Sequence, residues 1–239
     1  EFGYLQGEIR WMENRGDWKF ESHVLFDLPG TIHTPVADIN GDGQLDIVAL
    51  VSQDSEEVHG FEGDGRGHFR ARVIYGSTNK DYGSSGLCIA DVNKDGRPDI
   101  VYTNGDGFDY VTPGSRPWHG VQWLENKGGG KFAFHRIGDF PGCYSPVVID
   151  VDGDGDNDVV VCSGFNDWKN PAAVSLMCFE NDGTAHFQPR PLAYTPTHLI
   201  VVKAADLFND GRVALVTGSF VFYPPFGQAS RITLWERRP

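Results

Sequence analysis

One short aspartate-rich motif returns four times along the chain, and this repetition constrains the fold more than any other feature. The copies begin at Asp38, Asp91, Asp150 and Asp206, so successive copies lie 53, 59 and 56 residues apart. The first three (38–46, 91–99 and 150–158) share the pattern Asp-x-Asn/Asp-x-Asp-Gly-x-x-Asp, and each is followed by a β-branched run; the copy at 206–214 is degenerate. Even spacing of this kind predicts an array of similar supersecondary units.

A second motif lies between these loops and predicts a β-hairpin in every unit. It is an apolar run, a Gly/Asn/Asp turn, and a further run that begins with Phe. The copies lie at 11–20, 60–69, 123–132 and 178–187, with a half-copy at 232–236. Each unit therefore has four strands: one before the aspartate loop, one after it, and two in the hairpin. Four-stranded sheets repeated at this period are typical of β-propeller blades, so the predicted fold class is all-β.

The phase of the repeat indicates that the ring is incomplete. The chain opens with third and fourth strands over about residues 8–25, contains three complete units, and ends after the third strand of a fourth. Both ends supply a third strand, so the partial units at the two ends cannot combine into one four-stranded blade. We expect residues 1–239 to form a single β-propeller domain or propeller segment, completed by blades from the same precursor or another chain. A closed five-bladed ring with one defective blade is the alternative.

Composition narrows the possible partners. The formal net charge is −13, and such a surface repels phosphate backbones and anionic lipid, so nucleic acid is a poor candidate. No apolar stretch of about 18 residues is present, which argues against membrane insertion. Thirty glycines and fourteen prolines along the chain favour short strands with tight turns.

The first three loops have the donor spacing of a calcium site, because alternate oxygen ligands around a Gly turn form a cage that suits Ca²⁺ better than Mg²⁺. We expect about three ions. The predicted ligands, with the seventh position contributing its backbone carbonyl, are Asp38, Asn40, Asp42, Gln44 and Asp46; Asp91, Asn93, Asp95, Arg97 and Asp99; and Asp150, Asp152, Asp154, Asp156 and Asp158. The fourth loop has Phe208 and Ala214 at the third and ninth positions, so we expect no ion there.

An EF-hand begins in the same way, but it needs a Glu at loop position 12 and a helix after it. Position 12 is Ala49, Tyr102 or Val161, and the residues that follow are typical of strands. The three loops instead resemble the FG-GAP/VCBS repeats of integrin α-subunit propellers and of many bacterial extracellular proteins. This resemblance covers essentially the whole chain. It implies structural Ca²⁺ on one face of the propeller, a usual count of seven blades, and a secreted, cell-surface or periplasmic location.

The opposite face would collect the loops between second and third strands and the connections between blades. These segments are rich in aromatic, His and Asp residues, which suit sugar stacking or a protein hot spot. Alternatively, the aromatic side chains close over the ends of the blades. The candidate ligand-binding residues are His33, Tyr82, Asp109, Tyr110, Trp118, His119, Tyr144, Asp167, Trp168, His198, Tyr223 and Phe226.

Three functions remain open from the sequence. The favoured one is a non-catalytic binding or scaffold module for a protein or glycan partner. The second is a carbohydrate-active enzyme, either a polysaccharide lyase or a hydrolase, which would need His33, His119, His198 and Tyr144 to converge; no HExxH, GxSxG or P-loop motif is present. The third is an accessory propeller of a larger redox complex, whose haem or metal would lie in a partner.

The four cysteines have no CxxC spacing. Cys88, Cys162 and Cys178 lie in apolar runs and are expected to be small buried side chains. Cys143 follows Pro141-Gly142 and is expected in a loop, either free or paired.

Overall fold

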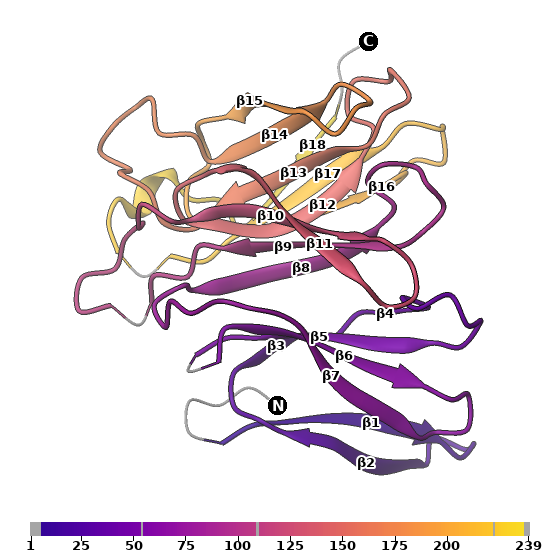
Figure 1. Cartoon of the computed structure of the whole chain (residues 1–239). Coiled ribbons are helices and arrows are strands. Elements are labelled where there is room, and N and C mark those ends of the chain that lie inside the picture. Colours follow the sequence, from indigo (N-terminus) through magenta and orange to yellow (C-terminus); the bar gives the residue numbers. More distant parts are fainter. Residues whose placement is uncertain (1–5, 54, 109, 222, 237–239) are drawn as a thin grey trace.

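The computed structural model describes residues 6–53, 55–108, 110–221 and 223–236. Within these residues the regular structure is β-strand, apart from one short 3-10 helix, η1 (Phe226–Gln228). The antiparallel sheets stack face against face along the chain, from the N-terminal sheet to the C-terminal one (Figure 1). The predicted all-β propeller architecture is confirmed. No helix in the described ranges is long and apolar enough to cross a membrane.

Three sheets are complete blades, each built from consecutive strands in the predicted order. Blade 1 comprises β3 (Thr31–His33), β4 (Val36–Ala37), β5 (Asp46–Val51), β6 (Glu57–Gly63) and β7 (Phe69–Gly76). Blade 2 comprises β8 (Ser84–Ala90), β9 (Asp99–Asn104), β10 (Gly120–Asn126) and β11 (Phe132–Asp139). Blade 3 comprises β12 (Cys143–Ile149), β13 (Asp158–Ser163), β14 (Leu176–Asn181) and β15 (Phe187–Ala193).

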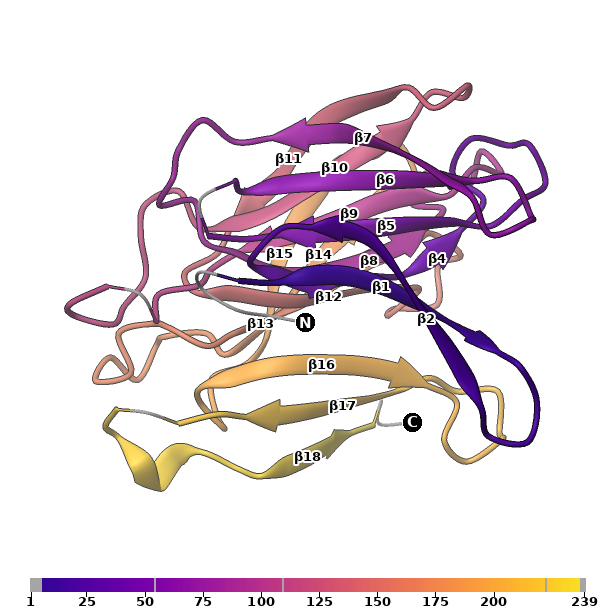
Figure 2. The same cartoon turned by 90° about the horizontal axis from the view of Figure 1, so that it is seen from below.

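The two ends of the chain form incomplete blades, as the phase of the repeat predicted. The half-blade is the hairpin of β1 (Glu8–Asn14) and β2 (Phe20–Asp27). The terminal blade contains β16 (Leu199–Ala205), β17 (Ala214–Ser219) and β18 (Ile232–Trp235), which lie side by side as one layer in Figure 2. Seven blades in an intact ring stays a prediction.

The first strand of blade 1 is broken in two, which the repeat did not predict. Pro35 lies between β3 and β4 and has no N–H to donate to the sheet. Its carbonyl still accepts a hydrogen bond from the Val48 N–H at 2.9 Å, so β4 resumes on the same partner strand, β5.

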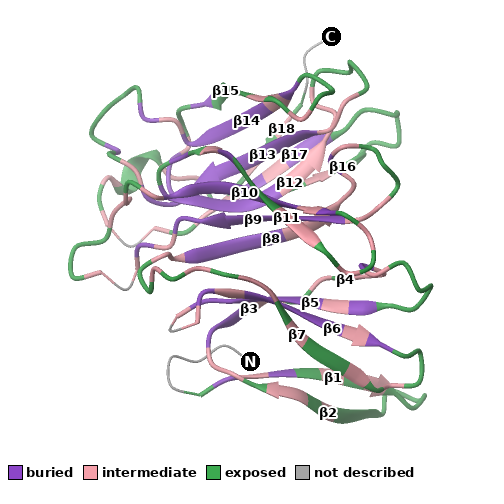
Figure 3. Cartoon of the chain, in the orientation of Figure 1, coloured by how far each residue is buried: buried purple, intermediate pink, exposed green. Residues whose placement is uncertain are grey.

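The second strand of each complete blade packs against both neighbouring blades, because successive strand residues point to opposite faces. In β13, Val159 and Val161 lie in a core shared with blade 2, whereas Val160 and Cys162 lie in a core shared with the terminal blade. These four side chains are fully buried, and the central strands are the most buried part of the molecule (Figure 3). A blade buries its faces only by stacking, so the fold depends on the array.

Neighbouring first strands are joined by serine side chains. The Ser85 hydroxyl on β8 donates to the Cys143 carbonyl on β12 at 2.6 Å. The Ser145 hydroxyl on β12 bonds both the carbonyl and the N–H of Val202 on β16, each at 3.1 Å. Close approach also requires Gly105, where a Cβ would collide with the backbone of Cys143.

Cys143 is therefore not a loop residue. It begins β12 and is fully buried, and all four cysteines are free thiols. Burial raises the pKa of Cys88 to about 12, because the thiolate would lose its hydration.

We predict that Ser145→Ala weakens the stacking of blade 3 on the terminal blade. The change leaves a buried N–H and a buried C=O of Val202 without their partner, which costs roughly 1–3 kcal/mol of unfolding free energy. Urea denaturation measures the loss. Ser22→Ala is the matched control, because Ser22 is exposed on β2; equal destabilisation by both variants would contradict the prediction.

Candidate functional site

The four aspartate loops connect the first and second strands of blades 1, 2 and 3 and of the terminal blade, at the right of Figure 1. In the first loop, the Asp38 carboxylate accepts hydrogen bonds from the backbone N–H groups of Gly41, Asp42 and Gly43, at 2.7, 3.2 and 2.8 Å. Gly43 has φ +84°, a conformation that other residues rarely adopt. The first aspartate therefore folds the loop around its own carboxylate.

The same turn forms in the other three loops. Asp91 accepts from Asp95 and Gly96, and Asp150 accepts from Gly153 and Gly155. Asp206 of the degenerate loop accepts from the N–H groups of Asp210 and Gly211, at 3.1 and 2.9 Å. The turn is thus independent of the ligands that the fourth loop lacks.

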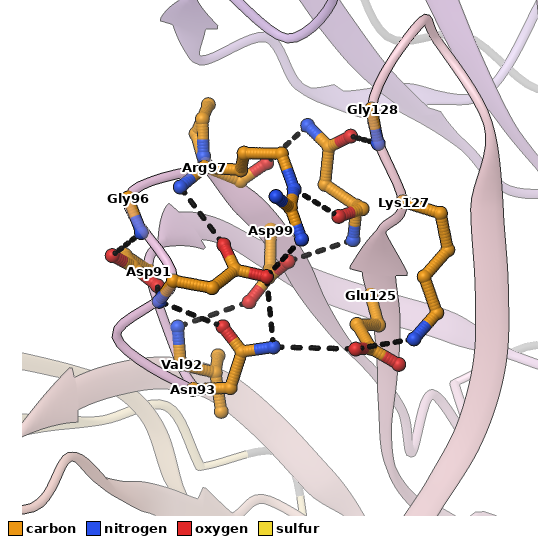
Figure 4. Close-up of polar contacts among 12 residues, drawn as sticks. Asp91, Val92, Asn93, Gly96, Arg97, Asp99, Glu125, Lys127 and Gly128 are labelled. Carbon is orange, nitrogen blue, oxygen red and sulfur yellow. Dashed lines mark hydrogen bonds and ion pairs between the residues drawn. The ribbon is translucent and has the colours of Figure 1, made fainter.

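The ninth aspartate is a buried junction within its blade. Figure 4 shows the second loop, where Asp99 accepts from the Val92 N–H at 3.0 Å and from the Asn126 N–H at 2.7 Å. One bond reaches the loop and the other reaches the end of the third strand. Equivalent pairs of bonds hold Asp46, from Ile39 and Gly63, and Asp158, from Val151 and Asn181.

These ninth-position carboxylates bear an electrostatic penalty. Burial, with a smaller contribution from the nearby charge of Asp95, raises the pKa of Asp99 to about 6 despite the hydrogen bonds that lower it. Burial also raises the pKa of Asp46 and of Asp158, each with a contribution from two neighbouring loop aspartates. A bound cation would remove this penalty by compensating the crowded negative charge.

The third loop brings three carboxylates together. Asp150, Asp152 and Asp158 each offer a carboxylate oxygen, and these oxygens lie within 4.8 Å of one another. A compact set of carboxylate oxygens fits a hard cation such as Ca²⁺. The seventh-position carbonyls of Gln44, Arg97 and Asp156 stay predicted ligands.

Arginine side chains change the charge in two loops. In the degenerate loop, Arg212 forms an ion pair with Asp210 at 2.6 Å. In the second loop, Arg97 pairs with Asp95, and its Nε also donates to the Asn126 carbonyl at 2.7 Å (Figure 4). A cation in the second loop would therefore compete with the Arg97 guanidinium for Asp95. The first and third loops have no arginine at the seventh position, so a cation there would face no such competition.

Two asparagines link one loop to the next, and sequence reasoning did not assign them this role. Asn126 Nδ2 donates to the Ile39 carbonyl in the first loop, at 2.9 Å. Asn157 Nδ2 of the third loop donates to the Asp91 carbonyl in the second loop, at 2.8 Å. Asn126 is the last residue of the motif Trp123–Asn126, which recurs in the hairpin of each unit. That recurrence could have identified Asn126 as a residue with a structural role.

Comparison with known families agrees with this geometry. The model of the FG-GAP-like repeat matches residues 38–102, 103–161 and 150–217, well over half of the chain. The chain belongs to the FG-GAP-like repeat family. Comparison with curated proteins found no match. This FG-GAP protein is thus a β-propeller module, and the matched segments together include all four aspartate motifs.

On the loop face of this FG-GAP protein, opposite the aspartate loops, five of the twelve candidate ligand residues lie in two aromatic groups. In the first, the Trp168, His198 and Tyr223 rings pack together, with centroids 5.3 Å (Trp168–His198) and 4.8 Å (His198–Tyr223) apart. In the second, Tyr110 Oη and Trp118 Nε1 both donate to the Asp81 carbonyl at 2.8 Å. In both groups the side chains contact neighbouring segments of the chain, an arrangement that the alternative of closing over the blade ends also expects.

Burial limits what several candidates can contact. Four of the candidates are buried: His119, Tyr144, Trp168 and His198. The Tyr144 hydroxyl donates to the Asp106 carboxylate at 2.9 Å. Five others are half-buried: His33, Tyr82, Tyr110, Trp118 and Tyr223. Asp167 and Phe226 are exposed, and Asp109 lies outside the described residues. Tyr194, which sequence reasoning missed, is exposed and lines a pocket of about 250 Å³ with Trp168, Thr197 and Gln228.

The candidate histidines are held by separate partners. His119 Nδ1 accepts from the backbone N–H groups of Arg116 and Gly142, at 3.2 and 3.3 Å. The Thr197 hydroxyl lies 2.9 Å from Nδ1 of His198. Burial, then the charges of Arg116 and Arg136, lower the pKa of His119 to about 4. The His119 ring is therefore neutral at pH 7, and its Nδ1 joins the loop at Arg116 to the start of blade 3 at Gly142.

We predict that His119 makes stability depend on pH. Its pKa is about 6.5 in the unfolded chain and about 4 in the folded protein, so the unfolded state binds the proton first. The contribution is fully present above pH 6.5 and is lost as the pH falls toward 4, by up to about 3 kcal/mol. Urea denaturation of the protein and of His119→Gln at pH 7 and 4.5 measures it. Equal pH dependence in the two proteins would contradict the prediction.

Proposed function

We propose that this FG-GAP propeller is a calcium-stabilised binding or scaffold module that acts outside the reducing cytosol. Repeats of this family are typical of extracellular or surface proteins. The observation that carries the calcium proposal is the recurrence of one arrangement in three loops. In each loop the first aspartate accepts hydrogen bonds from backbone N–H groups of its own loop, and the ninth aspartate is buried and has a raised pKa. Crowded carboxylates are stable at neutral pH when a divalent cation offsets their repulsion.

The binding role rests on the loop face. Long loops on a rigid scaffold are where recognition usually resides, and this face combines exposed Tyr194 and Phe226 with a small pocket. The partner class is a protein or a glycan. A glycan array probed in calcium and again in EDTA tests it: a signal that EDTA abolishes supports a glycan, and a silent array assigns the face to a protein.

We predict that Asp154→Ala removes one of three bound calcium ions. Calcium stabilises the folded state by mass action, by about 2.7 kcal/mol per site at a free concentration one hundred times the Kd. The wild type should show a large rise of the thermal midpoint in millimolar calcium, and the variant a smaller one. Isothermal titration gives the stoichiometry.

Asp210→Ala is the matched control, because Asp154 and Asp210 both hold the fifth position and both accept the backbone N–H two residues ahead. The control should keep three ions. A wild type that neither binds calcium nor gains stability from it would refute the calcium proposal.

A further inference from the structure

A small pocket of about 250 Å³ lies on the loop face, between blade 3 and the terminal blade. Three separate segments form it: the loop between β13 and β14, the connection from β15 to β16, and η1 in the loop between β17 and β18, all at the left of Figure 2. The lining residues that decide its chemistry are Trp168, Asn170, Tyr194, Thr195, Thr197 and Gln228. The pocket therefore lies away from the aspartate loops, which join the other ends of these strands.

Backbone hydrogen bonds hold the walls of this pocket in place. The Thr197 N–H donates to the Gln228 carbonyl at 2.9 Å, and the Thr197 carbonyl accepts from the Ser219 hydroxyl at 2.9 Å. In the blade 3 loop, the Ala173 N–H donates to the Asn170 carbonyl at 3.0 Å. The three segments are thus fixed before any ligand arrives, and small-molecule sites are usually pre-formed in this way.

The pocket offers hydrogen-bonding groups without charge. Among the described residues, no Asp, Glu, Lys, Arg or His side chain lines it. The Gln228 amide and the Thr195 hydroxyl are exposed, and neither side chain bonds another described residue. Asn170 is exposed as well, and only its Oδ1 is engaged, by the Ala172 N–H at 3.0 Å. These groups donate and accept hydrogen bonds, so the lining favours an uncharged ligand rich in hydroxyl groups.

Two aromatic side chains give the pocket an apolar side. Trp168 is buried, and its ring packs against that of His198 with centroids 5.3 Å apart, so its position is fixed. Tyr194 is 49% exposed and is accessible to a ligand. A sugar ring has a C–H face that packs on an aromatic ring, and it carries hydroxyls around its rim. The volume is below the range of about 300–1,000 Å³ that suits drug-sized ligands, so the pocket fits one ring.

A side chain from a protein partner would suit this pocket less well. A Leu or Phe side chain would cover the Gln228 amide and the Thr195 hydroxyl without bonding them. A polar group that loses water and gains no partner is costly, and this cost would offset the gain from apolar contact. A pyranose has hydroxyls on several sides of its ring and can bond several of these groups at once.

We propose that this pocket binds a single uncharged pyranose residue of a glycan. The C–H face of the sugar packs against Tyr194, and its hydroxyls bond the side chains of Gln228, Asn170 and Thr195. The inference rests on the binding role proposed above and names the class of its ligand. It does not depend on how many calcium ions the aspartate loops hold.

Saturation-transfer NMR on the full chain in millimolar calcium tests the ligand class. The probes are the methyl glycosides of glucose, galactose, mannose, fucose and N-acetylglucosamine, with those of glucuronic and galacturonic acid as charged counterparts. At least one neutral glycoside should bind saturably, and the two acids should give no signal, because the pocket has no cation to pair with a carboxylate. Silence of all five neutral glycosides with protein shown to be folded, or equal signals from the acids, would overturn the inference.

Variants at exposed positions show whether the sugar lies in this pocket. Gln228→Ala should weaken binding about two- to ten-fold, the range for one hydrogen bond between neutral groups, and Tyr194→Ala should also weaken it. Trp18→Ala is the matched control and should change nothing, because Trp18 is an exposed aromatic residue in the turn between β1 and β2.

The glycan array described above separates this inference from the broader proposal. A positive array whose signal survives both Tyr194→Ala and Gln228→Ala would overturn the inference and leave a glycan-binding module standing. A silent array together with silent glycosides would overturn the inference and assign the loop face to a protein partner.

Discussion

The buried carboxylate at the ninth position of each intact loop is the interaction on which a blade depends. In blade 2, Asp99 accepts one N–H from the loop and one from the end of the third strand, so a single side chain ties three strands together. The residue is fully buried, and burial disfavours its charge. A buried carboxylate is costly unless it is hydrogen-bonded, and the two backbone donors supply those bonds; a cation bound by the loop, as proposed above, would also compensate its charge.

The degenerate loop shows which features of the aspartate loop can occur without the others. It keeps the first aspartate and its two backbone bonds, but Ala214 replaces the buried carboxylate. Arg212 lies against Asp210 and supplies positive charge from within the chain. The turn itself therefore comes from the first aspartate and the glycine, whereas the tie to the third strand and the buried negative charge come from the ninth position.

The repeat predicted most of the fold because every unit contains the same two local patterns: alternating apolar residues, which form strands, and Asp/Gly turns between them. Both act over a few residues, so the strand order and the half-blade followed directly. The break at Pro35 was also readable in principle, since proline lacks the donor. Cys143 was misplaced because Pro141-Gly142 indicates a turn, while the strand that starts immediately afterwards is buried by blade 2 through Ser85.

The site was less predictable, and the reason is again physical. Loop spacing identifies oxygen donors, but it does not show whether an aromatic residue between strands faces solvent or a neighbouring blade. His119, Trp168 and His198 proved buried because adjacent blades cover them. Contacts of this type depend on the curvature of the whole array, which no single repeat specifies.

The amide bridges extend the argument from one blade to the face of the propeller. Asn126 of blade 2 bonds the first loop, and Asn157 of blade 3 bonds the second. Each asparagine donates its hydrogen bond to a carbonyl that is next to, or belongs to, the first aspartate of the neighbouring loop. Because that aspartate shapes its loop, ordering one loop restricts the position of the next. The first three aspartate loops are therefore a connected row, and a cation held in one of them would stabilise the stacking of two blades as well as the turn that surrounds it.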